Sequence, residues 1–424
     1  MPLRILMVSD SYPPLIGGAT RDTQLLSKEL VRRGYTVDVA TVGQPGLPER
    51  DDDDGVHVHR IDGLSSHFSS DPYRRHHPPL PDPTTVLAFR RLIRQARPDL
   101  VHSYGWLTYS CAAALPRSGT PLLVSIRDYG NVCAIRTLMQ QQSDGEHACS
   151  GPVVGKCLAC AQHYYHSPFK TMASVGGVYG GAELLRRKVW GLHYCSSYVR
   201  DVTRRHLLSG HTFERPLLER VISSFRSDVA DGEPDEKLLA HLPAEPFILF
   251  VGALRLVKGI EPLLAAYQRL SSPPPLVLLG QPTVDTPQRF PPGVIVVPGA
   301  SHATVMATWE RALFGVAPSI LPEPFGNVVH EGMSKGKTMI GTAPSGMTDM
   351  IVDGATGLLT PRGDVVALTR AMQQLIDDAP LRERLGRAAQ TRAALFTTDV
   401  VMPHFERLYH DLVAKDNVAI GLAQ

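Results

Sequence analysis

The chain has 424 residues, 43% of them hydrophobic and 20% charged, which is the composition of a folded globular protein and excludes disorder as its main state. At about 100–200 residues per domain, this length predicts two or three domains. The net charge of +2 argues against a general nucleic-acid binder.

Charge and hydropathy also limit how the chain can meet a membrane. No apolar run approaches the roughly 18–20 residues that are needed to span a bilayer. Residues 1–225 carry 26 Lys and Arg against 20 Asp and Glu, a mild excess that favours at most a weak peripheral contact with an anionic membrane. Because the first residues predict a strand rather than a signal peptide, we expect a cytoplasmic enzyme.

The first half of the chain has the pattern of a doubly wound parallel sheet. A strand at 4–8 runs into a loop that ends at Gly17 and Gly18, and a helix follows that stops at Gly34. Strand, glycine loop, helix and strand in this order open a Rossmann-like domain. The other elements predicted in this half are strands at 36–41, 56–61, 100–103 and 121–126 and a helix at 86–96. The acidic run Asp51–Asp54 is expected to be a solvated turn.

The same pattern restarts after residues 227–245, which are polar and rich in proline and predict an interdomain linker. Strands are then predicted at 247–251, 276–280, 294–297, 315–318 and 338–341. Two consecutive units of this kind predict an α/β protein with two Rossmann-like domains and a cleft between the carboxyl ends of their sheets.

The segment with the clearest chemical content is Glu323–Pro324–Phe325–Gly326, with Glu331 on the helix that follows. Gly326 and Asn327 would begin this helix, where free N–H groups and the helix dipole favour an anion or sugar hydroxyls. Glu323 in the loop and Glu331 about one turn into the helix could both face one ligand. Taken alone, two glutamates at this spacing are also typical of an exposed surface.

The run Glu323-x7-Glu331, with Gly336–Lys337–Thr338–Met339–Ile340 after it, resembles the donor-site motif of retaining, family-4-type glycosyltransferases of GT-B fold, the glycosyl transferases group 1. Further segments match in the family's order; they are Ile5–Ser9 with Tyr12–Pro13–Pro14 and Gly17–Gly18, Phe250–Val251–Gly252 with Lys258–Gly259, Ser345–Gly346, Asp353–Gly354, Thr356–Gly357–Leu358 and Gly363–Asp364. The resemblance implies an N-terminal acceptor-side domain (1–225), a donor-binding domain (226–397) and a C-terminal helix (398–424) that crosses back to the first domain.

The resemblance also implies roles for individual residues. Lys258 falls at the position of the family's phosphate-binding lysine, Glu323 would contact the donor sugar, and Glu331 would accept hydrogen bonds from the ribose hydroxyls. Cations and helix N-termini stabilise the charge on a leaving diphosphate, so the chemistry agrees with these roles. The other donor-binding residues implied in this way are Gly17, Gly18, Arg255, Phe325, Gly326 and Asn327.

The chain departs from the family's pattern at two positions. Ala253 stands where the family has an arginine after Val-Gly, and Arg255 can supply the guanidinium instead. Arg127 stands where members commonly have a histidine before the aspartate, here Asp128. An arginine stays protonated and cannot be a general base, but it can bind a phosphate or a carboxylate with two hydrogen bonds. We expect Arg127 to contact the substrate, with a structural pair to Asp128 or another carboxylate as the alternative.

Four of the six cysteines lie close together as Cys133-x15-Cys149-x7-Cys157-x2-Cys160. A Cys-x2-Cys pair with two further cysteines nearby suits tetrahedral zinc, and an intracellular compartment disfavours disulfides. A structural zinc site, reduced thiols and disulfides all stay open for this cluster.

The reaction that the resemblance implies is transfer of a sugar from a nucleoside-diphosphate sugar, foremost a UDP- or GDP-sugar, to a hydroxyl of a glycan, a lipid-linked acceptor or a natural product. The anomeric configuration would be retained, and the transition state would resemble an oxocarbenium ion. No catalytic cofactor is expected, since this fold normally needs no metal and we find no Asp-x-Asp site that would hold one. Two alternatives are a nucleotide-sugar epimerase on the same scaffold and a catalytically silent sugar-nucleotide binder.

Overall fold

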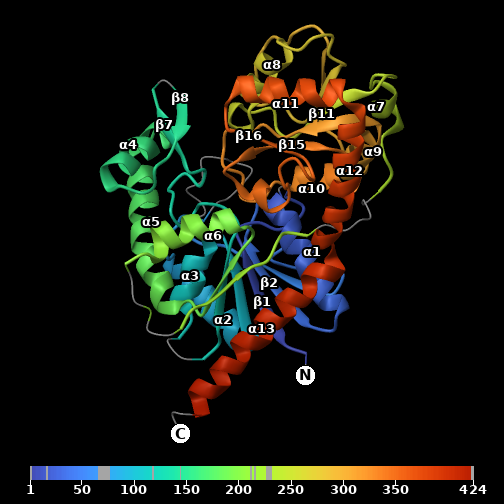
Figure 1. Cartoon of the computed structure of the whole chain (residues 1–424). Helices are drawn as coiled ribbons and strands as arrows, with labels where there is room; N and C mark the ends of the chain where they lie inside the picture. The colour runs from blue at the N-terminus through green and yellow to red at the C-terminus, as the bar shows by residue number, and fades with distance from the viewer. Residues whose placement is uncertain are drawn as a thin grey trace. The chain divides into compact units, whose positions relative to one another are not determined.

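The computed structural model describes residues 2–15, 18–64, 77–116, 119–143, 145–210, 213, 216–225 and 232–421. The chain is an α/β protein that divides into two compact units, each built on a sheet of mainly parallel strands (Figure 1). Unit 1 comprises Met1–Ile222 and Met402–Gln424, and unit 2 comprises Ser223–Val401. No helix within the described ranges is long and apolar enough to cross a membrane.

Unit 1 is built on an eight-stranded sheet with the strand order β10-β9-β6-β5-β1-β2-β4-β3, in which only β3 and β4 pair antiparallel. Its strands are β1 (Arg4–Ser9), β2 (Thr36–Val42), β3 (Arg50–Asp53), β4 (Val56–Ile61), β5 (Leu100–Tyr104), β6 (Leu122–Ile126), β9 (Gly191–Tyr194) and β10 (Leu218–Val221). The central strands are buried on both faces, which explains why β1, β5 and β6 read as apolar runs in the sequence.

The strands of unit 1 are connected by helices, and one connection also contains a β-hairpin. They are α1 (Gly18–Arg32), α2 (Pro83–Ala96), α3 (Leu107–Ala114), α4 (Val154–Tyr165), α5 (Pro168–Lys188), α6 (Ser197–Thr203) with the π-helical turn η2 (Arg204–Leu208), and α13 (Thr398–Gly421), which enters unit 1 at Met402. The insertion is the two-stranded sheet of β7 (Met139–Gln142) and β8 (Gly145–Ala148). Local signals set these bounds: Asp82 caps α2 by accepting a hydrogen bond from the Thr85 N–H at 2.9 Å, and Pro83 follows it.

The acidic run Asp51–Asp54 is largely exposed, as its charge predicts, but only its last residue lies in a turn. Three of its residues lie in the edge strand β3, which pairs antiparallel with β4. Asp53 accepts a hydrogen bond from the Tyr12 hydroxyl at 3.0 Å and forms an ion pair with Lys28 at 2.6 Å. The turn itself is made by Asp54 and Gly55. The conformation of β3 is thus fixed by residues of α1 and of the loop before it, and the acidic run alone could not reveal these partners.

A buried hydrogen-bond chain ties β5, β6 and β9 to α13. The Tyr409 hydroxyl donates to Nδ1 of His102 at 2.9 Å, and Nε2 of His102 donates to the Ser125 hydroxyl at 2.6 Å. Ser125 in turn donates to Nδ1 of His193 at 2.6 Å, and Nε2 of His193 donates to the Ile222 carbonyl at 2.7 Å. Burial lowers the pKa of both histidines and keeps both imidazoles neutral, and because the Ile222 carbonyl only accepts, this order of donors then follows.

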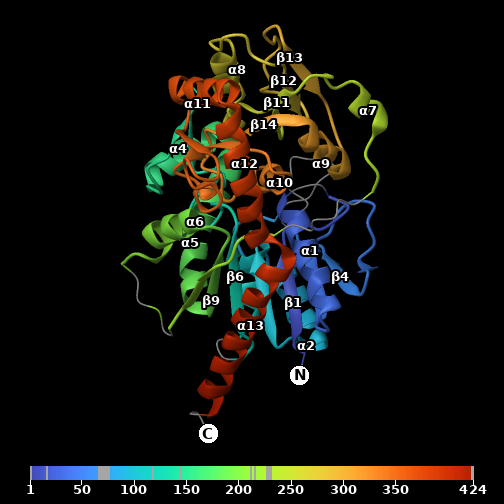
Figure 2. The same cartoon turned by 45° about the vertical axis from the view of Figure 1, so that its right-hand side comes forward.

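The first part of helix α13 within unit 1 passes beside α1 in both views (Figures 1 and 2). Arg33, at the end of α1, lies 3.3 Å from the Glu406 carboxylate, and the Phe405 ring packs against His193 with ring centroids 4.8 Å apart. Leu408 and Leu412 are buried on the same side of the helix. The apolar face of α13 is therefore part of the core of unit 1.

Unit 2 is built on a six-stranded, fully parallel sheet with the order β13-β12-β11-β14-β15-β16. Its strands are β11 (Phe247–Val251), β12 (Leu276–Leu279), β13 (Val294–Val297), β14 (Ala312–Val316), β15 (Met339–Ala343) and β16 (Leu358–Pro361). Its helices are α7 (Glu236–Ala240), η3 (Leu256–Lys258), α8 (Ile260–Tyr267), α9 (His302–Arg311), α10 (Asn327–Ser334), η4 (Gly346–Asp349), α11 (Val365–Asp377), α12 (Ala379–Ala393) and η5 (Ala394–Phe396). Strand β11 matches the predicted bounds, whereas β14 begins three residues earlier than predicted.

Candidate functional site

The candidate site in unit 2 lies at the carboxyl ends of two neighbouring strands, β11 and β14. Lys258 ends the short helix η3 after β11, and Glu323 lies in the loop after β14. The Lys258 ammonium is 2.6 Å from Oε1 of Glu323, and the Ser319 hydroxyl donates to the same oxygen at 2.6 Å. The Glu323 side chain is 11% exposed and that of Lys258 is 33% exposed, so a largely buried carboxylate is paired with a cation that solvent or a ligand can still reach.

A glycine makes this approach of the two loops possible. Gly259 has a φ of +81°, and a Cβ at this position would lie 2.0 Å from the carbonyl oxygen of Pro318. Only glycine adopts this conformation freely and leaves room for the neighbouring backbone. The Lys-Gly pair of the sequence motif therefore has a structural reason: Gly259 lets the loop that carries Lys258 close onto the loop that carries Glu323.

Helix α10 begins at Asn327, directly after the Glu323 loop. Gly326 precedes it with a φ of +97°, and the Phe325 ring is buried against Phe396 with ring centroids 5.9 Å apart. The side-chain oxygen of Asn327 is buried and has no hydrogen-bond partner among the described residues. The N-terminus of α10 thus combines a helix dipole with a buried polar atom that a bound ligand could satisfy.

Glu331 lies in the second turn of α10 and faces a partner that the sequence did not suggest. Oε1 of Glu331 is 3.5 Å from Nε2 of His302, the first residue of α9, and both side chains are about seven-eighths buried, at 14% and 15% exposure. His330, the preceding residue, points elsewhere and packs against Phe396. The only sequence signal for His302 is its place after the helix cap Ser301, which does not specify a function.

Arg255 lies in the loop between β11 and η3, at the edge of the site. Its Nε is 3.8 Å from the Asp285 carboxylate, and its side chain is 43% exposed. Burial opposes ionisation of Asp285, but hydrogen bonds from Thr283 and from the Leu256 N–H outweigh it and lower the pKa of this carboxyl. Arg255 is therefore a partly exposed cation in a long ion pair, which a ligand can replace at modest cost.

In unit 1, Arg127 follows β6 and is almost entirely enclosed. Its side chain is 8% exposed, its nearest carboxylate is Asp22 of α1 at 3.8 Å, and its guanidinium carbon lies 5.8 Å from the centre of the Tyr104 ring. Nε and Nη1 are buried without a hydrogen-bond partner among the described residues. Leaving such donors unpaired is costly in a folded interior, so an acceptor from outside the chain is the natural complement of Arg127.

Of the two structural alternatives for Arg127, the pair with Asp128 is not formed, whereas a pair with another carboxylate is present as the contact with Asp22. Asp128 is occupied by Arg136, which donates to it from Nη2 at 2.6 Å and from Nε at 2.9 Å. Arg136 also bonds Asp10 at 2.8 Å and lies over the Trp106 ring at 5.0 Å. Burial opposes the charge of Arg136, but the carboxylates of Asp128 and Asp10 outweigh it and raise its pKa. Arg136 and Asp10 are 126 residues apart in the sequence, so their spacing could not reveal that they form a pair.

The glycine loop is described in part. Gly18 is the first residue of α1, while Gly17 lies outside the described residues. Beside the loop, the Ser11 and Thr20 hydroxyls are hydrogen-bonded at 2.7 Å. The start of α1 therefore follows β1 at the carboxyl edge of the sheet of unit 1, which is where parallel α/β sheets bind ligands.

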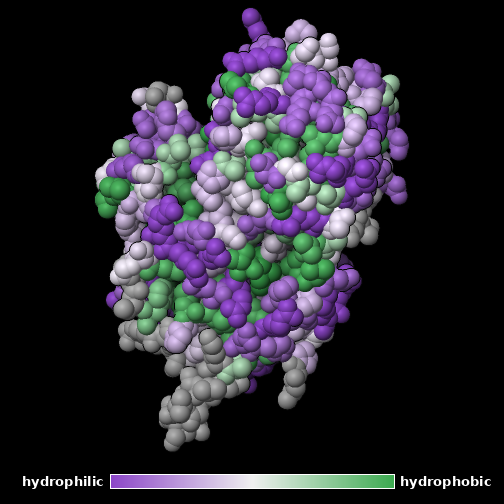
Figure 3. All heavy atoms as spheres, viewed as in Figure 1, coloured by the Kyte–Doolittle hydropathy of each residue, from purple (hydrophilic) through white to green (hydrophobic). Residues whose placement is uncertain are grey.

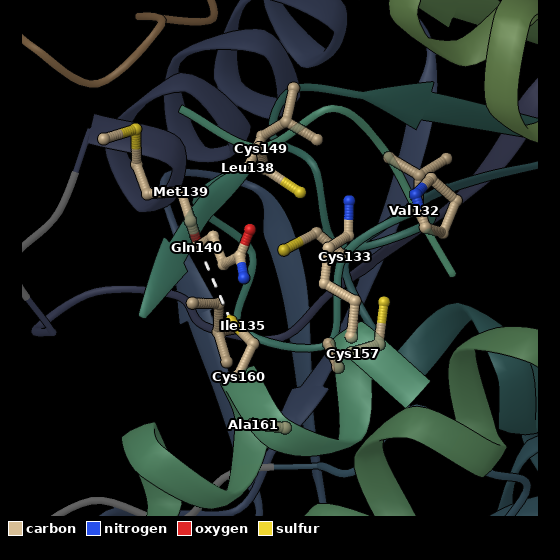
Figure 4. Close-up of a pocket in the computed structure, with 13 residues that line it drawn as sticks. Val132, Cys133, Ile135, Leu138, Met139, Gln140, Cys149, Cys157, Cys160 and Ala161 are labelled. Carbon is tan, nitrogen blue, oxygen red and sulfur yellow. Dashed lines mark hydrogen bonds between the residues drawn. The ribbon is translucent and has the colours of Figure 1, made fainter. Parts of the chain in front are cut away.

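The four clustered cysteines line one small, largely apolar pocket between the β7–β8 hairpin and α4, with a cavity volume of about 20 Å³ (Figure 4). All six cysteines of the chain are free thiols, and burial raises the pKa of Cys133 to about 11. Within the described ranges, no group of three or more His, Cys, Asp or Glu side chains is arranged to hold a metal ion. The structure thus does not support zinc at Cys133, Cys149, Cys157 and Cys160, because these thiols face a pocket instead of a common coordination point.

Comparisons with known proteins agree with this architecture. Two family models match the chain: glycosyl transferases group 1 over residues 235–392 and a glycosyl transferase 4-like domain over residues 17–166. The glycogen synthase of Mycobacterium tuberculosis is 27% identical over 421 residues, which cover 92% of this chain and 90% of that protein.

Solved structures match the fold over nearly the whole chain. The sucrose-phosphate synthase from Thermosynechococcus elongatus matches with a TM-score of 0.71 at 22% identity, covering 97% of this chain and 100% of that one. Anabaena HepE in complex with UDP matches with a TM-score of 0.63 at 16% identity, covering 96% of this chain and 99% of that one. These matches confirm the predicted fold class. The chain belongs to the glycosyl transferases group 1, the family-4-type glycosyltransferases of GT-B fold.

Proposed function

We propose that this glycosyltransferase transfers a sugar from a nucleoside-diphosphate sugar to an acceptor hydroxyl and retains the anomeric configuration. The observation that carries the proposal is the ion pair of Lys258 with the largely buried Glu323, in the loop that leads into α10. A donor of this class has two parts that need opposite partners, an anionic diphosphate and a neutral sugar with many hydroxyls. A lysine, a carboxylate and a helix N-terminus supply those partners within one loop cluster.

The diphosphate leaves with about two negative charges when the glycosidic bond breaks, so the site must stabilise charge that develops there. The Lys258 ammonium and the first N–H groups of α10 provide fixed positive charge, and Arg255 adds a guanidinium that is only loosely held. Glu323 then binds the sugar hydroxyls. No side chain in this cluster is placed as an obvious base, so the leaving diphosphate accepts the proton of the acceptor hydroxyl.

The nucleoside part of the donor is assigned to Glu331. A ribose offers two neighbouring hydroxyl donors, and a partly buried carboxylate is a strong acceptor for both. His302, 3.5 Å away, limits the orientations that this carboxylate can adopt. The unpaired oxygen of Asn327, at the start of the same helix, is a second acceptor for a donor hydroxyl.

Arg127 completes the proposal from unit 1. A permanent cation beside an oxocarbenium-like centre would raise the barrier unless an anion lies between them. We therefore assign the unpaired N–H groups of Arg127 to the donor diphosphate or to an acidic group of the donor or acceptor. The planar guanidinium suits the paired oxygens of a phosphate or carboxylate.

A thermal-shift panel of UDP-, GDP- and ADP-sugars tests the donor class. Ligand at 100 times its dissociation constant stabilises a fold by about 2.7 kcal/mol, which is about 5–10 °C for a domain of this size. One nucleotide should raise the melting temperature clearly more than the other two, and acceptor screening with that donor then separates a transferase from an epimerase or a silent binder. If no donor at millimolar concentration shifts the melting temperature, the proposed donor class is wrong.

A further inference from the structure

We propose that Arg136 is a positioning residue: it holds three loops at the carboxyl edge of unit 1 in one arrangement and so fixes the place of Arg127 toward the donor. This inference rests on the proposed contact between Arg127 and the donor. Arg136 lies in the segment between β6 and the β7–β8 hairpin. None of the motifs that carry the resemblance to the family contains it.

The backbone around Arg136 adopts an uncommon conformation. Arg136 and Leu138 have φ angles of +65° and +56°, in the left-handed region that residues other than glycine and asparagine rarely enter. Such a conformation persists only where the surrounding contacts fix it, and it is frequent at functional sites. For Arg136, contacts of the side chain are available to do this.

The Arg136 side chain joins two carboxylates that follow different strands. Nη2 and Nε donate to Asp128 at 2.6 and 2.9 Å, and Nη1 donates to Asp10 at 2.8 Å. Asp10 follows β1 and Asp128 follows β6, so the two carboxylates belong to different loops at the same edge of the sheet. Two neighbouring anions repel each other, and a guanidinium that bonds both of them offsets this repulsion.

The three charges are mostly enclosed. Hydrophilic residues usually cover the surface, as they do in Figure 3 where Figure 1 places α6. The side chains of Asp10, Asp128 and Arg136 are instead only 15%, 21% and 28% exposed. Removing one partner from such a cluster leaves an uncompensated charge in a poorly solvated position. The arrangement of the two loops therefore depends on Arg136.

Asp10 also holds a third loop, which follows β5. It accepts hydrogen bonds from the N–H groups of Trp106 and Leu107, at 3.0 and 2.7 Å, where α3 begins. Gly105 has a φ of +81°, and a Cβ at this position would lie 2.4 Å from the Asp10 carboxylate. The Arg136 guanidinium lies 5.0 Å from the centre of the Trp106 ring. The loops after β1, β5 and β6 thus meet at one guanidinium.

Arg127 is connected to this cluster in two ways. It directly precedes Asp128, so its backbone moves with that residue. Its guanidinium carbon lies 5.8 Å from the centre of the Tyr104 ring, and the Tyr104 hydroxyl donates to Asp128 at 3.2 Å. When Asp128 loses Arg136, both supports of Arg127 change together. A displacement of about 1 Å at a group that contacts the reacting atoms can lower turnover by about 10²-fold.

The different partners of the two arginines separate their roles. Arg136 donates to carboxylates of the chain itself. Nε and Nη1 of Arg127 are buried without a hydrogen-bond partner in the described part of the chain, and the nearest carboxylate, Asp22, lies 3.8 Å away. Arg127 is therefore the arginine that can bind the donor, and Arg136 acts through it.

A double-mutant cycle tests this dependence. The measured rate is release of nucleoside diphosphate, with water as acceptor, from the UDP-, GDP- or ADP-sugar that stabilises the protein most. Arg136→Ala should lower kcat by about 10²-fold. In an Arg127→Ala background the same substitution should change kcat by less than about twofold, since no guanidinium is left to position. Arg136→Lys, which keeps the charge and loses the planar fork, should be intermediate.

The matched control is Arg33→Ala. The Arg33 side chain is 26% exposed and also bonds two carboxylates of unit 1, Glu29 at 2.8 Å and Glu406 at 3.3 Å. It precedes β2 and therefore lies at the amino edge of the sheet. Its loss measures what the removal of such a bridge does to stability alone, and kcat should stay within about twofold of the parent.

An equal fold-loss of kcat from Arg136→Ala in the parent and in the Arg127→Ala background would overturn the proposal and make Arg136 structural. If circular dichroism shows that Arg136→Ala is unfolded, the cycle is run with Arg136→Lys and the same outcomes decide. Parental turnover in Arg127→Ala would overturn the assignment of Arg127 and this inference with it. A parent that binds the donor but releases no nucleoside diphosphate would overturn the proposed transferase reaction itself.

Discussion

At the residue scale, Lys258 is the side chain on which the proposed chemistry depends most. Its ammonium lies 2.6 Å from the Glu323 carboxylate, in the loop cluster to which we assign the leaving diphosphate. Replacing it removes charge stabilisation in the transition state, which typically costs a factor of about 10²–10³ in kcat. We therefore predict that Lys258→Ala slows sugar transfer by about this factor in a single-turnover assay.

The control for this variant is Lys237→Ala, since Lys237 is an exposed lysine of α7 in the same unit. Because Lys258→Ala leaves the Glu323 carboxylate without its cation, the fold of the variant is checked by circular dichroism, and Lys258→Ala/Glu323→Gln removes the unpaired charge. Transfer at the parental rate by a folded Lys258→Ala protein would exclude contact between this lysine and the diphosphate.

Glu331 is the residue assigned to the ribose. Loss of a charged hydrogen-bond acceptor should weaken nucleotide binding by about 1–3 kcal/mol in Glu331→Ala, a factor of about 5 to 150 in the dissociation constant. Titration calorimetry with the preferred nucleoside diphosphate measures this directly, with the exposed Glu245→Ala as control. Unchanged affinity in Glu331→Ala would place the ribose elsewhere.

Arg127 is one of the two positions at which this chain departs from the family's pattern. If its unpaired N–H groups bind an acidic group of the substrate, Arg127→Lys should lose much of the activity, because it keeps the charge and loses the planar pair of donors. Arg90→Lys, at an exposed position of α2, is the matched control. Rates within about twofold of the parent for both Arg127→Lys and Arg127→Ala, a difference of only about 0.4 kcal/mol in the barrier, would make Arg127 structural.

At the element scale, the attachment of α13 to the sheet of unit 1 is sensitive to pH. Burial, with the charge of Arg127 as a further cause, lowers the pKa of His193 to about 3, and burial likewise lowers the pKa of His102. In the unfolded chain both titrate near 6.5. The unfolded state therefore binds more protons below this pH, and the stability that the neutral histidines contribute is full above pH 6.5 and lost progressively as the pH falls.

We predict that His193 lowers the free energy of unfolding of unit 1 by up to about 1.4 kcal/mol per pH unit between pH 6 and pH 4, and that His102 adds an effect of the same sign. Urea unfolding at several pH values measures this slope. The slope should be smaller in His193→Gln, which cannot take up a proton, and unchanged in His57→Gln, whose side chain is exposed on β4. An equal slope for His193→Gln would show that other groups control the acid sensitivity.

Three strands, β11, β9 and β3, show which parts of the fold could be predicted from the sequence and which could not. Strand β11 was predictable residue by residue because five apolar residues stand between polar segments. Strand β9, with the sequence Gly-Leu-His-Tyr, was not predicted because a histidine interrupts its apolar pattern. In the structure this histidine is buried, and hydrogen bonds to Ser125 and Ile222 satisfy its two ring nitrogens. Strand β3 was missed because its acidic residues are stabilised by Tyr12 and Lys28, which are distant in sequence.

At the scale of the whole molecule, the order of motifs along the chain was more informative than any single motif. The repeated pattern of strands and glycine loops predicted two α/β halves, and the spacing of Glu323 and Glu331 identified the loop that carries them. The partners of those residues could not be predicted. Ser319 and His302 reach the two glutamates through the packing of loops and helices, and no local periodicity encodes such contacts.

The most direct test of retaining sugar transfer is proton NMR of the first sugar product formed from the donor that stabilises the protein most. With an α-linked donor, the sugar released to water or transferred to an acceptor should appear first as the α-anomer, together with one equivalent of the nucleoside diphosphate. The β-anomer as the first product would contradict retention, and a folded protein that binds the donor but releases no nucleoside diphosphate would contradict the transferase itself.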